Sequence, residues 1–151
     1  ALNAIKNEII NCKICHGITE ENPCKICNDG RRDPNLICLV ESPYDVFVIE
    51  KLNSFKGRYH ILGGTLSPLD GVGPDDLNIN SLLDRIKEGM EVIIATNPSV
   101  EGETTALYIC KILSEVNVSI SKLARGVPVG SDLEYVDDAT LIRAMEGRVS
   151  I

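Results

Sequence analysis

Four cysteines near the N-terminus have the residue type and spacing of a metal site. They form two Cys-x-x-Cys pairs, Cys12 with Cys15 and Cys24 with Cys27, and eight residues separate the pairs. A two-residue gap lets both thiolates of a pair face one point, and two pairs complete the tetrahedron that Zn²⁺ prefers. Because four cysteine ligands leave no position for water, the pattern favours a structural zinc site over a catalytic one. The alternatives are two disulfides or a redox site, although a redox site needs only one such pair.

Acidic side chains at the ends of two predicted strands could also do chemistry. Leu36–Val40 is a continuous apolar run that predicts a buried strand, and Glu41 follows it directly. A second predicted strand, residues 92–95, leads into a helix through an acidic turn that contains glycine. If the two strands are neighbours, four carboxylates converge there: Glu41, Asp45, Glu101 and Glu103. Carboxylates suit Mg²⁺, but Glu101 and Glu103 also fit the ordinary place of acids in the first turn of a helix.

Alternating strands and helices must position these groups. After residue 35 the sequence predicts an α/β fold with the β-α-β-α order of a doubly wound parallel sheet. Functional groups in such sheets gather beyond the carboxyl ends of the strands. The expected strands are residues 36–40, 58–62, 92–95 and 118–123, and the expected helices are residues 43–52, 79–87, 102–113 and 137–146. Ahead of the cysteines, the apolar spacing over Ala1–Ile10 predicts the last turns of an amphipathic helix.

The two histidines and the two remaining cysteines are expected to have no chemical role. His16 follows a predicted zinc ligand, but with four cysteines present it is expected to face solvent. His60 lies in a predicted strand and is expected to pack in the core. Cys38 and Cys110 fall at apolar positions and are interpreted as core thiols.

The net charge of −7 argues against a strong stand-alone DNA-binding protein, because phosphate contacts need Lys and Arg. Residues 1–34 carry as many basic as acidic side chains, so residues 35–151 hold the whole excess of negative charge. An acidic domain suits a cation or a basic partner protein. The sequence has neither a membrane-length apolar run nor a signal peptide, so we expect no membrane partner and a cytoplasmic protein.

Two segments carry a family resemblance. Residues 40–43 (Val-Glu-Ser-Pro) and 95–103 (Ala-Thr-Asn-Pro-Ser-Val-Glu-Gly-Glu) resemble the two signatures of the Toprim domain, which type IA topoisomerases, bacterial primases and RecR proteins share. The resemblance implies that the glutamate used by Toprim enzymes as a general acid or base is retained as Glu41. It also implies that the aspartate pair that holds Mg²⁺ is lost, because Asn97 and Ser99 stand in its place.

The chain as a whole resembles the RecR family. The zinc pattern with Thr19 and Arg32, residues 62–74 and residues 125–130 are similar to RecR motifs in the same order. The resemblance implies an α/β fold with a Toprim-type, Rossmann-like parallel sheet and a small N-terminal four-cysteine zinc module. It further implies an N-terminally truncated chain without the helix-hairpin-helix region that RecR proteins place before the zinc module. The implied domains are 1–11, the tail of an N-terminal helical region; 12–34, the zinc module; 35–125, the Toprim domain; and 126–151, a C-terminal assembly region.

The resemblance implies a non-enzymatic scaffold for DNA repair and recombination. RecR proteins form rings that can encircle DNA, and they work with RecO and RecF to place RecA recombinase on gapped DNA. The implied cofactor is structural Zn²⁺, with at most a weak Mg²⁺ site, and DNA contact is expected mainly through the missing N-terminal hairpins. The acidic cluster would then bind a partner, RecO being the candidate. One alternative is a magnesium-dependent Toprim phosphotransfer enzyme or nuclease, and another is an isolated zinc-bearing interaction domain.

Overall fold

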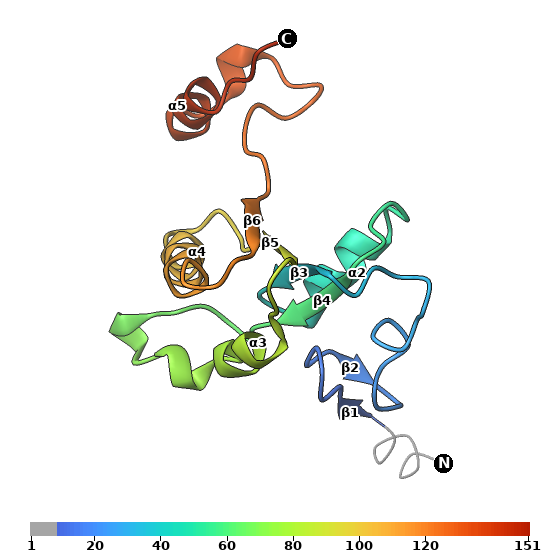
Figure 1. Ribbon diagram of the computed structural model, residues 1–151. Helices are drawn as coiled ribbons and strands as arrows, with labels where there is room; N and C mark the ends of the chain where they lie inside the picture. Colours follow the sequence, from blue (N-terminus) through green and yellow to red (C-terminus); the bar gives the residue numbers. More distant parts are fainter. Residues whose placement is uncertain (1–8) are drawn as a thin grey trace. The chain divides into compact units, whose positions relative to one another are not determined.

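The computed structural model describes residues 9–151, and the chain divides into two compact units (Figure 1). The first unit runs to Ser121 and contains the cysteine pairs and the sheet, and the second unit is Lys122–Ile151. Residues 1–8 of the predicted N-terminal helix lie outside the described residues. Among residues 9–151, none of the helices combines the length and the apolar character that crossing a membrane requires.

The predicted helical tail is wrong at its two described residues, since Ile9 has no regular secondary structure and Ile10 begins a strand. Ile10–Asn11 (β1) is a strand that pairs antiparallel with Ile18–Thr19 (β2), with Ile10 opposite Thr19. The chain has to turn back between these strands to bring the first cysteine pair to one point, and the amide of Cys12 donates to the carbonyl of Gly17 at 2.7 Å. A hairpin closes this turn, whereas a helix that continued through residue 10 would carry the chain past it.

A four-stranded sheet within the described residues forms the centre of the first unit, in the order β4-β3-β5-β6. The strands are Leu36–Val40 (β3), Arg58–Ile61 (β4), Glu91–Ile94 (β5) and Ser119–Lys122 (β6). β3 pairs in parallel with β4 on one side and with β5 on the other. The strand order therefore reverses between β3 and β5, which confirms the predicted doubly wound arrangement and places its switch point between these two strands.

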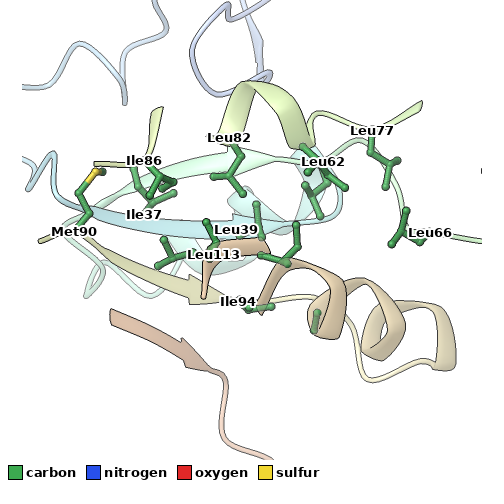
Figure 2. Packing of buried hydrophobic residues seen from close by; sticks show 14 residues of the cluster. Ile37, Leu39, Leu62, Leu66, Leu77, Leu82, Ile86, Met90, Ile94 and Leu113 are labelled. Atoms are coloured by element: carbon green, nitrogen blue, oxygen red, sulfur yellow. The ribbon is translucent and has the colours of Figure 1, made fainter. Parts of the chain in front are cut away.

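Both faces of β3 are buried, which explains its continuous apolar sequence. Side chains alternate between faces along a strand, so Ile37 and Leu39 contribute to one core and Cys38 and Val40 to the other. The first core lies against α3 (Ile79–Arg85) and α4 (Val100–Leu113), and Figure 2 shows Leu82 and Leu113 beside the β3 side chains. The second core lies against α2 (Pro43–Glu50), through Val46 and Ile49.

The helices differ from the predicted ranges at their ends. α2 and α3 each end two residues before the predicted position. α4 begins two residues earlier than predicted, because the hydroxyl of Ser99 accepts a hydrogen bond from the amide of Gly102 at 2.9 Å and caps the helix there. Between β4 and α3, the segment rich in Gly, Pro and Asp contains the short 3₁₀ helices Pro68–Asp70 (η1) and Pro74–Asp76 (η2).

The second unit contains the 3₁₀ helix Leu133–Tyr135 (η3) and the predicted C-terminal helix, Asp138–Glu146 (α5). Asp137 caps α5 by accepting a hydrogen bond from the amide of Thr140 at 3.1 Å. Residues 122–151 are all described, and every one of them is at least partly exposed. The exposed side chains include several large apolar ones: Leu133, Tyr135, Ile142, Met145, Val149 and Ile151.

Candidate zinc centre and acidic sheet edge

The four cysteine sulfurs are arranged as the ligands of one tetrahedral metal ion. Cys12, Cys15, Cys24 and Cys27 are buried, and their Sγ atoms all lie within 4.8 Å of one another. The Cys12–Cys27 and Cys15–Cys24 sulfur pairs are 3.9 Å and 3.7 Å apart. Zinc–sulfur bonds of about 2.3 Å in a tetrahedron put the sulfurs about 3.8 Å apart, so these residues fit Zn²⁺.

The same geometry argues against the disulfide alternative. None of the six cysteines, all of them in the described part of the chain, is in a disulfide. The sulfur distances of 3.7 Å and 3.9 Å are nearly twice the roughly 2.05 Å of a disulfide bond. The four-cysteine group is therefore a metal site by its chemistry and by its shape.

Backbone amides surround the sulfurs, as the short Cys-x-x-Cys turns require. The amides of Gly17, Cys24 and Cys27 each point at a cysteine sulfur at 3.4 Å. Hydrogen bonding from Cys27 lowers the pKa of Cys15 to about 5, whereas burial raises the pKa of Cys24. The cluster thus stabilises thiolate at Cys15, the form that binds zinc.

His16 does not face solvent, contrary to the expectation from sequence. It is half-buried, and its Nε2 lies 2.8 Å from the hydroxyl of Ser81 in α3. Its ring also packs edge-on against His60, with the ring centroids 5.2 Å apart. His60 is fully buried in the core, as predicted, and burial lowers its pKa to about 4. The residue after the second cysteine therefore attaches the first cysteine pair to the sheet.

A second attachment joins the end of the zinc module to α2 and β4. Arg32 forms an ion pair with Glu50 in α2, and its guanidinium donates to the carbonyl of Gly57 at 3.0 Å. The other oxygen of Glu50 accepts a hydrogen bond from Tyr59 of β4 at 2.5 Å. These contacts make the zinc module an integral part of the first unit.

At the sheet's carboxyl edge, Glu41 is held by a residue from the neighbouring strand end. One oxygen of its carboxylate accepts from the backbone amide of Asn97 at 2.7 Å and from the side-chain amide of Asn97 at 2.5 Å. Glu41 is only 9% exposed. Gly102 allows this arrangement, because a Cβ there would lie 2.0 Å from the carbonyl oxygen of Asn97. Two donors of Asn97 thus converge on one oxygen of the Glu41 carboxylate.

The other predicted acids lie on the first turns of two helices. Asp45 accepts hydrogen bonds from the amide and hydroxyl of Ser42 at 3.2 Å and 3.4 Å, so it caps α2. Glu101 is exposed and Glu103 is half-buried in the first turn of α4. Among residues 9–151, the four cysteines form the one group of three or more potential ligands close enough for a metal. These acids therefore lie at helix starts, and the weak Mg²⁺ site stays a prediction.

A groove beside α2 was not predicted from the sequence. It has a volume of about 600 Å³ and lies between the zinc module and the α2–β4 side of the sheet. Ile18, Val46 and Phe47 supply apolar walls, and Glu20 and Glu21 are also among its lining residues. Phe47 is 61% exposed on α2. Large apolar residues on the outer side of a predicted helix are the sequence signal that could have indicated this surface.

Comparison with known proteins matches three segments of the chain to family models. Family models match residues 9–29 as the four-cysteine zinc finger domain of RecR, residues 35–124 as the Toprim domain and residues 126–149 as the C-terminal region of RecR. A "Recombination protein RecR" of Tropheryma whipplei is 54% identical over 149 residues, which cover 97% of this chain and 75% of the relative. A protein of the same name from Desulforudis audaxviator is 53% identical, over 98% of this chain and 76% of the relative.

Proposed function

The chain belongs to the RecR family of recombination proteins, and we propose that it acts as a non-enzymatic scaffold of DNA repair. In this role it works with RecO and RecF to load RecA recombinase on gapped DNA. The RecR zinc-finger and C-terminal models that flank the Toprim match support the assignment. The finer role rests on what the Toprim site of this chain can and cannot do chemically.

The observation that carries the proposal is the hydrogen bonding of Glu41 by Asn97. A general acid or base has to reach substrate, and Mg²⁺ for phosphoryl transfer needs carboxylates in a definite geometry. Here two donors occupy one oxygen of a carboxylate that is largely buried. Asn97 and Ser99 offer neutral groups where Toprim enzymes have aspartates, and Ser99 is already used to cap α4. A hard dication would be held weakly by this set.

The rival function is a magnesium-dependent Toprim phosphotransferase or nuclease. Its support is that Glu41 lies at the switch point of the sheet, where ligands of doubly wound folds bind. The two functions are separated by incubating the full chain with supercoiled DNA, or with primed template and nucleotides, at millimolar Mg²⁺. We expect neither nicking nor primer synthesis. A Mg²⁺-dependent activity that disappears in Glu41→Gln would contradict the scaffold function and support the enzymatic one.

We assign the acidic sheet edge to partner binding. Glu41, Asp45, Glu101 and Glu103 all follow the ends of β3 and β5, and their carboxylates would together steer a basic surface towards this edge of the sheet. The apolar groove beside α2 opens next to the same helix that carries Asp45. A partner with basic residues around an apolar side chain, for which RecO is the candidate by family, would find both kinds of contact on this side.

DNA binding and assembly belong to the same proposal. The net charge of −7 favours weak DNA contact by this chain, with the main contact made by the hairpin region that RecR proteins carry ahead of the zinc module. The second unit exposes the apolar side of α5, including Ile142 and Met145. A second copy of the chain is the proposed occupant, as a ring-forming homo-oligomer requires. The protein is proposed to work in the cytoplasm.

A further inference from the structure

Arg85, the last residue of α3, connects the sheet with the first cysteine pair. Its Nη1 lies 2.7 Å from the carbonyl oxygen of Tyr59, 3.0 Å from Nδ1 of His60 and 3.4 Å from the carbonyl oxygen of Ile14. Ile14 lies between Cys12 and Cys15, so the guanidinium reaches the turn that presents two zinc ligands. The amide of Ile61 adds a parallel link by donating to the carbonyl of Cys15 at 2.9 Å.

The contact with Arg85 determines the protonation of the histidine beside it. A guanidinium can only donate, so Nδ1 of His60 accepts and the proton of His60 is on Nε2. That nitrogen lies 2.7 Å from the carbonyl oxygen of Asn78, to which it donates. The hydroxyl of Ser81 donates to the same carbonyl at 3.2 Å and can accept from His16. The donors and acceptors around the two histidines agree with this protonation, and the network runs from α3 to the residue after Cys15. Nη1 of Arg85 has two protons for its three acceptors, so the longer contact with Ile14 shares one of them.

The charge of Arg85 complements the metal centre. A Zn²⁺ ion with four thiolates has an excess of two negative charges. The half-buried Arg85 guanidinium lies within hydrogen-bond distance of the carbonyl of Ile14, in the turn that carries Cys12 and Cys15, so its positive charge lies close to the metal–thiolate group. In other metal sites, residues that form hydrogen bonds around the metal ligands change the metal affinity.

We propose that Arg85 is a positioning residue of the zinc centre, which holds the first cysteine pair on α3 and offsets the negative charge of the metal–thiolate group. The zinc affinity of the N-terminal module then depends on the sheet domain. Conversely, zinc binding stabilises the α3 side of the sheet, because Arg85 and His16 hydrogen-bond between the first cysteine turn and the sheet domain. The zinc centre and the Toprim sheet are thus one cooperative unit.

The test compares zinc affinity in the full chain for wild type, Arg85→Gln and Arg85→Lys, by competition with a chromophoric chelator. The matched control is Lys87→Gln, which removes the same charge from an exposed residue just beyond α3. We expect Arg85→Gln to weaken zinc binding by about 10- to 100-fold, in the range found for groups behind metal ligands. Arg85→Lys, which keeps the charge but not the forked geometry, should restore part of the affinity, and Lys87→Gln should leave it unchanged.

Thermal unfolding with and without zinc separates this role from a merely structural one. If Arg85 only supports the fold, Arg85→Gln lowers the melting temperature equally in both forms and leaves the zinc affinity at the wild-type value, which would overturn the proposal. Equal loss of affinity in Lys87→Gln would overturn it as well. If Arg85→Gln does not fold, Ser81→Ala breaks the link to His16 without touching the guanidinium. Ser81→Ala should then bind zinc more weakly than wild type, and wild-type affinity in that variant would contradict the network.

Discussion

Replacement of Asn97 by aspartate should turn the closed contact at Glu41 into a site that needs a cation. The Asn97 side-chain amide donates to the Glu41 carboxylate at 2.5 Å, and Asn97→Asp puts a second carboxylate in its place. The variant loses a hydrogen bond to a charged group, worth about 1.5–3 kcal/mol. It gains repulsion between two carboxylates, which at about 4 Å and an effective dielectric constant of about 20 amounts to roughly 4 kcal/mol before relaxation.

Solvent reduces this cost, because residue 97 is exposed even though Glu41 is not. We therefore expect Asn97→Asp to lower the free energy of unfolding by about 2–3 kcal/mol at pH 8 without divalent cations. Mg²⁺ should restore part of it: at about 10 mM and with a dissociation constant near 1 mM, the gain is roughly 1.4 kcal/mol. Urea denaturation of wild type and variant, each with Mg²⁺ and with EDTA plus added Zn²⁺, measures both effects.

A matched control is available in the same unit. The side-chain amide of Asn117 donates to the carboxylate of Glu88 at 2.9 Å, but both residues are exposed. Asn117→Asp creates the same pair of carboxylates in water, where we expect a cost below about 1 kcal/mol and no recovery with Mg²⁺. Wild-type stability of Asn97→Asp at pH 8 without cations would contradict this prediction, and so would equal stabilisation of wild type and variant by Mg²⁺.

Three further predictions concern zinc, pH and DNA. Cys24→Ser should abolish tight zinc binding, measured as about one zinc per chain in wild type by elemental analysis, and should unfold the zinc module because a closed thiolate shell supplies folding energy directly. The pKa of buried His60, lowered to about 4, lies below the roughly 6.5 of the unfolded chain. As pH falls, the unfolded chain therefore binds the proton before the folded chain does, and up to about 3 kcal/mol of stability is lost between about pH 6.5 and 4. Urea denaturation across this pH range should show a smaller pH dependence of the free energy of unfolding in His60→Gln than in wild type. An unchanged pH dependence in the variant would show that another group titrates there. The 151 residues, with a net charge of −7, should bind double-stranded DNA weakly, as measured by fluorescence anisotropy at two salt concentrations. Tight, salt-sensitive binding would contradict this and would place DNA contacts at Lys13, Lys25, Arg31 and Arg32 of the zinc module.

The parts of the structure that follow from local pattern could be predicted from the sequence. Leu36–Val40 is apolar at every position because both its faces are buried, so its place in the sheet was correct to the residue. The four zinc ligands were found because two turns supply them over a short stretch of chain. Glu41 meets residue 97 only because β3 and β5 are neighbouring strands. The β-α-β order allowed this pairing but did not require it, so from the sequence it could be stated only as a condition.

The contacts between distant segments could not be predicted. Arg85 reaches a cysteine turn 71 positions earlier in the chain, and no spacing rule connects the two. His16 was misplaced for the same reason, since its partner Ser81 is 65 positions away. The end of the predicted N-terminal helix was wrong at Ile10 because the apolar spacing there fits a helix, while the turn around the first cysteines imposes a strand pair. In each case a tertiary contact decided the outcome over the local pattern.

The scaffold role is tested most directly by RecO binding to protein whose acidic edge has been reversed. Glu41→Lys with Glu103→Lys is compared with wild type and with the control Glu115→Lys, an exposed acid just after the opposite end of α4, after zinc content and melting temperature confirm that each protein is folded. We predict that RecO affinity falls by about 10-fold or more and becomes less sensitive to salt, that the control binds as wild type does, and that none of the proteins cleaves DNA. Unchanged RecO binding, together with a magnesium-dependent cleavage that only the reversed protein has lost, would contradict the scaffold role.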